Sequence, residues 1–206
     1  TGYLTDTAHW KQMLLNKTYG HPDYPLALPG VLAFLRKLFM GIIGMSVTYA
    51  FHFTITLLIP LLIYFETYTR SLFIAGLCLI LFATNEFYLL EGMAQMADTL
   101  LAFFFLCALV SIEHGRQDRK MLILAAFFLG CCAWTKNEGL ILAFIFLLFN
   151  ANILFSRANI KYFFLGIALP AITLAIFKLG YAPPNDMVQG QGKHTYTLLF
   201  EKERYK

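Results

Sequence analysis

Lys136 and Glu138 stand in the sequence Ala-Trp-Thr-Lys-Asn-Glu-Gly-Leu (133–140), which separates two long apolar runs. Charged side chains at the edge of a hydrocarbon layer are costly unless they meet an opposite charge, a polar cavity or a lipid headgroup. A lysine ammonium in this place can neutralise a phosphate, and a neighbouring carboxylate can hold the lysine. The pattern therefore predicts a functional charged site at a membrane surface. The plainer interpretation is a short polar turn between two transmembrane helices.

Two further groups of polar residues lie close to apolar runs. His21, Asp23 and Tyr24 occupy a proline-bounded segment, and Glu91 and Asp98 precede an apolar run. Carboxylates in such places can accept a proton from an attacking hydroxyl or hold a divalent cation. Simpler roles stay open as well. Asp23 can stabilise a turn and Asp98 the start of a helix, while His21 suits an ordinary loop and Tyr24 an anchor at headgroup level.

The composition around these residues is that of a membrane protein. Of the 206 residues, 59% are hydrophobic and only 14% are charged, against roughly 25% charged in a soluble domain. We therefore expect an all-α membrane fold. The net charge of +4 comes without a clustered basic face, which argues against a nucleic-acid partner. The four cysteines lie in apolar runs without metal-ligand spacing, so we expect free cysteines in the core.

Six apolar segments are predicted to cross the membrane. They are residues 42–65, 71–90, 99–112, 121–134, 140–155 and 162–179. Several have only about 14 to 16 residues, fewer than a spanning helix usually needs, so their ends must be buried in protein or flanked by snorkelling side chains. The apolar segment 25–40 is interrupted by Arg36 and Lys37, and we expect it to be an interfacial juxtamembrane helix.

Basic residues predict how these segments are oriented. Alternate connections carry Arg70, then Arg116, Arg119 and Lys120, then Arg157 and Lys161. By the positive-inside rule these connections face the cytoplasm, and the charged motifs described above share the outer face. The expected organisation is an external first loop at 1–24, the interfacial helix at 25–40, a helical bundle at 42–180, and an external loop or the start of a following region at 181–206.

Three motifs in this order resemble the polytopic glycosyltransferases of the GT-C fold. They are His21-Pro22-Asp23-Tyr24-Pro25-Leu26, the segment from Glu91 to Asp98, and Trp134-Thr135-Lys136-Asn137-Glu138-Gly139. They are similar in particular to members related to the protein O-mannosyltransferases and to bacterial lipid A sugar transferases. The resemblance implies transfer of a sugar from a polyprenyl-phosphate donor to a lipid or glycan acceptor at the outer face of a bacterial inner membrane.

The resemblance also implies roles for the residues of the second and third motifs. Lys136, Asp98 and Glu138 would bind the donor phosphate, and Glu91 is a further candidate. The cofactor is open: a divalent cation, Mg²⁺ or Mn²⁺, held near Asp98 is one alternative.

The general base is implied to be an acidic residue of the first external loop. In this chain it is Asp6 or Asp23, with His21 and Tyr24 as neighbouring candidates. Such enzymes carry a helix before this loop, and none precedes the loop here, so we expect a fragment whose catalytic aspartate can also lie upstream of Thr1.

Two other classes of function stay open, a membrane transporter or lipid-carrier fragment and a non-catalytic membrane subunit. Against a transporter, most charges gather at one face and no internal repeat is present. His52 lies inside a predicted crossing, where it is either a core histidine that bonds a neighbouring helix or a functional group.

Overall fold

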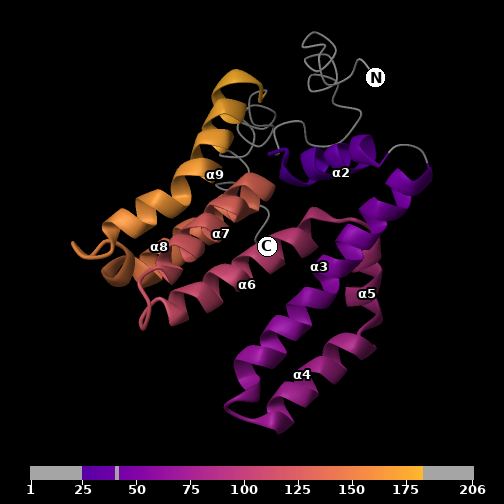
Figure 1. The fold of residues 1–206 in the computed structure, drawn as a ribbon, viewed down its shortest axis with the longest axis horizontal. Helices are drawn as coiled ribbons and strands as arrows, with labels where there is room; N and C mark the ends of the chain where they lie inside the picture. Colours follow the sequence, from indigo (N-terminus) through magenta and orange to yellow (C-terminus); the bar gives the residue numbers. More distant parts are fainter. Residues whose placement is uncertain (1–24, 40–41, 183–206) are drawn as a thin grey trace, which may run out of the picture. The chain divides into compact units, whose positions relative to one another are not determined.

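The computed structural model describes residues 25–39 and 42–182, and every regular element in this part of the chain is an α-helix. The helices are α2 (Ala27–Leu38), α3 (Ile42–Tyr68), α4 (Leu72–Thr84), α5 (Glu86–Met93), α6 (Ala97–His114), α7 (Met121–Thr135), α8 (Asn137–Leu154) and α9 (Ile160–Gly180) (Figure 1). Residues Leu26–Leu174 form one compact unit, and the packing described below is the packing within it.

The lengths of these helices confirm an all-α membrane protein. α3, α6, α8 and α9 are each long and apolar enough to cross a membrane, and α4 with α5 passes the same test as a pair bent by 64°. α7 is apolar but has 15 residues, fewer than the roughly 20 of a typical spanning helix. Each of the six predicted crossings thus contains apolar helix. The predicted crossing at 71–90 is not one continuous helix, because the chain breaks at Asn85.

Protein, more than lipid, surrounds the short α7. Its buried side chains pack against α6, α8 and α9 in the largest hydrophobic cluster. The cluster contains Ala108, Ile112, Leu122, Ala125, Ala126, Leu129, Phe146, Leu154 and Phe163. Small residues bring the helices close, since a Cβ atom on Gly130 would lie 2.7 Å from Cβ of Pro170 in α9. This burial meets the requirement that a short crossing be covered by its neighbours.

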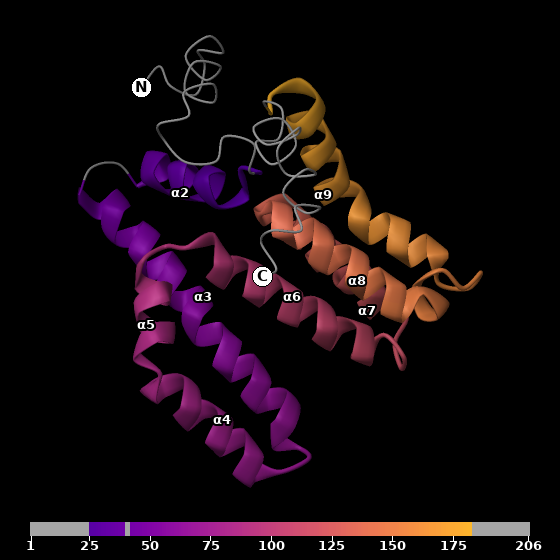
Figure 2. The same cartoon turned by 180° about the vertical axis from the view of Figure 1, so that it is seen from behind.

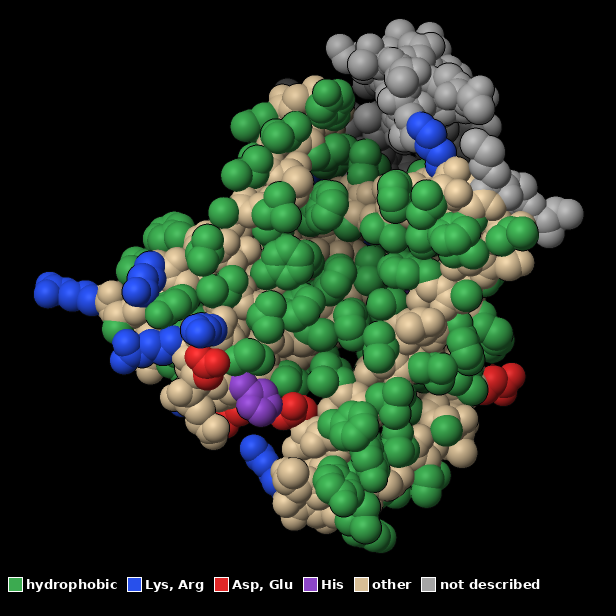
Figure 3. All heavy atoms as spheres, viewed as in Figure 1, with side chains coloured by type: hydrophobic (Ala, Val, Ile, Leu, Met, Phe, Trp, Pro, Cys, Tyr) green, Lys and Arg blue, Asp and Glu red, His purple; other side chains and the backbone are tan. Residues whose placement is uncertain are grey.

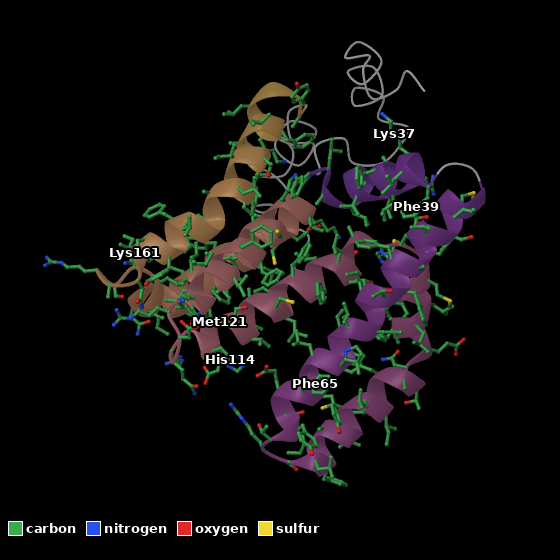
Figure 4. All side chains as sticks on the ribbon, in the orientation of Figure 1. Lys37, Phe39, Phe65, His114, Met121 and Lys161 are labelled. Carbon is green, nitrogen blue, oxygen red and sulfur yellow. The ribbon has the colours of Figure 1, made fainter. Side chains whose placement is uncertain are left out.

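Consecutive long helices run in alternating directions. α3 packs against α2, α4, α5 and α6, while α7 lies between α6 and α8 (Figures 1 and 2). Figure 4 shows His114, Met121 and Lys161 at one end of this arrangement and Lys37 and Phe39 at the other. The basic connections around His114 and Lys161 are therefore at one end of the unit, as the charge pattern predicts.

The surface of the long helices is apolar. Hydrophobic side chains cover much of the face in Figure 3, and the charged side chains lie mainly at its margins. Exposed large hydrophobic residues include Phe73 on α4, Phe144 and Phe149 on α8, and Leu165 on α9. So much exposed apolar surface suits contact with lipid and would promote association in water.

α2 does not cross the membrane by length, because it has 12 residues. It buries Ala27 and Leu28 and exposes Phe34 and Leu38, and its last turn carries Arg36 and Lys37. Basic side chains at the C-terminal end of a helix interact favourably with the helix dipole. An interfacial position for α2 agrees with this pattern and stays a prediction.

Candidate functional site

The break between α7 and α8 is one residue long. α7 ends at Thr135, α8 begins at Asn137, and the extended backbone of Lys136 (φ −155°, ψ 154°) joins them. The N–H of Gly139 donates a hydrogen bond to the carbonyl of Lys136 at 3.0 Å. The polar turn predicted for 133–140 is thus far tighter than the sequence indicates. It places Lys136 at the N-cap of α8 and Glu138 in the first turn of that helix.

The Lys136 ammonium lies between two carboxylates. Its Nζ is 2.9 Å from Oδ1 of Asp98 and 3.7 Å from Oε1 of Glu138. Asp98 is in the first turn of α6, so the ion pair joins the N-terminal ends of two helices. The side chain of Lys136 is 19% exposed, whereas that of Asp98 is 63% exposed. Three residues predicted to bind the donor phosphate therefore lie together.

A glycine allows these helix ends to meet. A Cβ atom on Gly139 would lie 1.9 Å from the carbonyl oxygen of Cys132 in α7 and 3.1 Å from Cδ1 of Leu101 in α6. Cys132 itself approaches α6, with Sγ 3.9 Å from the carbonyl oxygen of Leu101. α6, α7 and α8 therefore touch about one turn from the ion pair. All four cysteines are free, and Cys107, Cys131 and Cys132 are buried, as predicted for core residues.

The electrostatics of this site combine one ammonium, two carboxylates and two helix N-termini. Two helix N-termini and one ammonium attract negative charge, and backbone N–H groups at helix N-termini are suited to phosphate oxygens. Asp98 occupies the exposed side of the ammonium, and Glu138 holds it from the start of α8. Asp98 and Glu138 thus hold the ammonium between the starts of α6 and α8.

The described residues do not fit the predicted divalent-cation site. Within the part of the chain that the structure describes, no group of three or more His, Cys, Asp or Glu side chains is placed to hold a metal ion. Asp98 also contacts the positively charged Lys136, which opposes a second cation at the same oxygen.

Of the remaining predicted residues, the structure describes Glu91 alone. Glu91 is on α5, which packs against α3 and α4, and it forms no ion pair with the residues that the structure describes. Asp6, His21, Asp23 and Tyr24 lie outside the described residues. The identity of the general base thus stays a prediction.

α3 carries a buried polar stripe of Thr48, His52 and Thr56, of which the sequence analysis singled out only His52. Thr48, His52 and Thr56 are 0%, 0% and 1% exposed, and they face α5 and the turn that follows it. Gln95 donates a side-chain hydrogen bond to Oγ1 of Thr48 at 3.4 Å. The spacing 48, 52, 56 places these side chains on one helix face, so the four-residue period was the signal in the sequence.

Comparison with protein-family models, curated proteins and solved structures finds no match for this chain. The resemblance to GT-C enzymes is therefore supported by the three short sequence motifs alone. The geometry of the Lys136 site comes from the structure.

Proposed function

We propose that this chain is part of a membrane glycosyltransferase that moves a sugar from a polyprenyl-phosphate donor to an acceptor hydroxyl. The observation that carries the proposal is the ion pair of Lys136 and Asp98 between the N-terminal turns of α6 and α8. The order of the three GT-C-like motifs supports the same reading. A site of this kind holds a phosphate at the margin of an apolar bundle, which is where the headgroup of a lipid-linked donor lies.

Lys136 acts on the leaving group. In the transfer, the bond between the anomeric carbon and the phosphate oxygen breaks, and the phosphate departs with the electron pair. The ammonium and the two helix N-termini stabilise the negative charge that grows on this oxygen. Asp98 and Glu138, whose carboxylate oxygens lie 2.9 and 3.7 Å from Nζ, hold the ammonium in place beside the phosphate.

The acceptor completes the reaction. Its hydroxyl oxygen attacks the anomeric carbon on the side opposite the phosphate, so the configuration inverts. A carboxylate takes the hydroxyl proton, for which Asp6 and Asp23 are the candidates in this chain.

The site faces outward in this proposal, in a bacterial inner membrane. The basic connections at the opposite ends of α6 and α8 support that orientation by the positive-inside rule. They include Arg116, Arg119 and Arg157.

Reconstituted full-length protein tests the proposal. Vesicles that contain a radiolabelled polyprenyl-phosphate sugar and an acceptor extract are assayed for transfer with Lys136→Ala and with Asp98→Ala. Loss of a transition-state electrostatic partner typically lowers the rate by about 10²- to 10³-fold. We expect a loss of that order for Lys136→Ala, and a loss for Asp98→Ala because the ammonium is then no longer held in place. Glu113→Ala and Arg116→Ala are matched controls, because this ion pair, with Nε and Oε2 3.0 Å apart, lies at the other end of α6.

Other results would point to other functions. Wild-type turnover in both Lys136→Ala and Asp98→Ala contradicts the assigned site. Solute or lipid transport without sugar transfer indicates a transporter or lipid carrier. Neither activity in the intact protein indicates a non-catalytic subunit.

A further inference from the structure

The bent span formed by α4 and α5 crosses beside α3 in a single direction. Two contacts establish the register: Tyr88 of α5 reaches Thr56, and Gln95, after α5, reaches Thr48. From Tyr88 to Gln95 the chain advances by 7 residues, while the contacted residue on α3 moves back by 8, from Thr56 to Thr48. This is the pattern of antiparallel segments. α5 is therefore antiparallel to α3, and α4, which also packs along α3, runs in the same direction as α5 in Figure 1, so we interpret the bent pair as one broken crossing. We name residues Glu86–Met96, which are α5 and the turn after it, the outer arm.

A proline in α3 creates the acceptor that the outer arm uses. Pro60 lies inside α3 and has no N–H, so the carbonyl of Thr56, four residues earlier, lacks its usual helical donor. In hydrocarbon an unpaired carbonyl is costly, and a neighbouring helix must satisfy it. The hydroxyl of Tyr88 donates a hydrogen bond to this carbonyl. Pro60 thus leaves the Thr56 carbonyl without a helical donor, and the hydrogen bond from Tyr88 to this carbonyl joins α3 to the outer arm.

Close packing surrounds this contact. A Cβ atom on Gly92 would lie 2.4 Å from Oγ1 and 2.5 Å from Cγ2 of Thr56, so only glycine lets the outer arm lie so near α3. About two turns nearer the start of α3, Thr48 accepts the hydrogen bond from Gln95. Gln95 has a positive φ of 55°, an uncommon conformation for a residue other than glycine. The turn is therefore held in an unfavourable backbone conformation by its contacts with α3.

His52 lies between Thr48 and Thr56 and completes the polar stripe. Its side chain is fully buried, and its ring lies near the backbone of Met96. Neither ring nitrogen is in hydrogen-bond geometry with a residue that the structure describes. Met96 is the N-cap residue of α6, two residues before Asp98. The polar stripe thus contacts the outer arm up to the start of the helix that carries the ion pair.

We propose that the hydrogen bond from Tyr88 to the Thr56 carbonyl, which Pro60 leaves without a helical donor, anchors the outer arm to α3 and thereby positions Asp98 at the start of α6. Tyr88, Pro60 and His52 are positioning residues that touch neither Lys136 nor its carboxylate partners. The anchor itself is independent of the reaction. Its consequence for donor binding rests on the proposed function, because it acts through Asp98.

Hydrogen exchange of the full-length protein in lipid nanodiscs tests the anchor. Tyr88→Phe removes the donor and leaves the Thr56 carbonyl unpaired, so we expect the amides of residues 89–97 to exchange about fivefold faster, the effect of losing one hydrogen bond of about 1 kcal/mol. Exchange in α7 and α8 should not change. Tyr64→Phe is the matched control, since the Tyr64 hydroxyl makes no hydrogen bond with the described residues and its ring contacts Phe65 and Tyr68.

Pro60→Ala provides the decisive comparison. It restores an N–H for the Thr56 carbonyl, so Tyr88→Phe in the Pro60→Ala background should accelerate exchange less than twofold, well below the roughly fivefold effect of one hydrogen bond. An equal acceleration in both backgrounds, or none in either, overturns the anchor. If Tyr88→Phe alone yields little folded protein, adding Pro60→Ala should restore the yield, and a failure to restore it also overturns the anchor.

Different measurements test the anchor and the proposed function, so that one proposal can fail while the other holds. If exchange follows the pattern above while Lys136→Ala and Asp98→Ala keep full sugar transfer, the anchor stands and the glycosyltransferase proposal falls. If both proposals hold, Tyr88→Phe should raise the donor KM more than it lowers kcat, because it displaces a donor-binding carboxylate and removes no charge. An unchanged donor KM with accelerated exchange would show that the arm does not position Asp98.

Discussion

Lys136 and Asp98 are 38 residues apart in the sequence, yet Nζ of Lys136 and Oδ1 of Asp98 lie 2.9 Å apart. The contact joins the first turns of α6 and α8, with α7 between them. The two partners differ in exposure, since the lysine is 19% exposed and the aspartate 63%. Removing either charge should therefore affect function and stability to different degrees.

Asp98→Asn should separate these two properties. The exposed carboxylate contributes at most about 1 kcal/mol through the ion pair, because solvent screens it. We expect the free energy of unfolding in detergent to fall by about that amount or less, while donor-dependent transfer falls by about 10²-fold or more. Thermal unfolding and turnover, measured on the same preparation, check this. A parallel loss of both would indicate that Asp98 serves the fold alone.

Gly139→Ala should disrupt the junction of α6, α7 and α8. The new methyl group would lie 1.9 Å from the Cys132 carbonyl, which is backbone and cannot rotate away. We expect a destabilisation of about 3 kcal/mol, at the upper end for overpacking. The measurement is thermal unfolding in detergent. Gly76→Ala in α4 is the control, because nothing lies within 4 Å of its added methyl group, and it should be neutral or slightly stabilising. Equal stability of the two variants would contradict the close approach at Gly139.

Asn85→Ala should weaken the outer half of the broken crossing. The side-chain oxygen of Asn85 accepts a hydrogen bond from the N–H of Tyr88 at 3.0 Å and caps α5. Loss of an N-cap costs about 1 kcal/mol. We expect faster hydrogen exchange in residues 86–91, and Asn85→Asp should retain slow exchange. Ser71→Ala at the start of α4 is a useful comparison, because its capping bond is longer, at 3.3 Å. An unchanged hydrogen-exchange rate in Asn85→Ala would show that the Asn85 cap does not stabilise α5.

Cysteine labelling in intact cells should reveal which end of the bundle faces outward. Ala94→Cys, in the exposed turn before α6, should react with a membrane-impermeant maleimide. Arg119→Cys, in the exposed connection between α6 and α7, should react only after permeabilisation. The native cysteines give the background, which is measured on the unmodified protein. The reverse pattern would place the Lys136 site in the cytoplasm and contradict an outward-facing donor site.

Helix boundaries show where hydropathy was a poor guide. The predicted crossings began at Thr99 and Leu140, after the charged residues, whereas α6 begins at Ala97 and α8 at Asn137. A hydropathy pattern ends a segment at a charged residue. The helical hydrogen bonds of the backbone can include that residue, because a carboxylate is favourable in the first turn of a helix. Asp98 and Glu138 are therefore part of their helices, a placement that directs both carboxylates toward Lys136.

The sequence alone determined the class of protein and the candidate charges of the site. Apolar runs long enough for helices imply membrane crossings, and charges between them must gather at the margins, because hydrocarbon does not solvate them. Only the tertiary structure decided which of these charges meet. Glycines at 139 and 92 set how closely helices approach, and the carbonyl of Thr56 gains its partner from a tyrosine 32 residues away. Such contacts depend on the packing of helices distant in the sequence, which no local pattern of residues specifies.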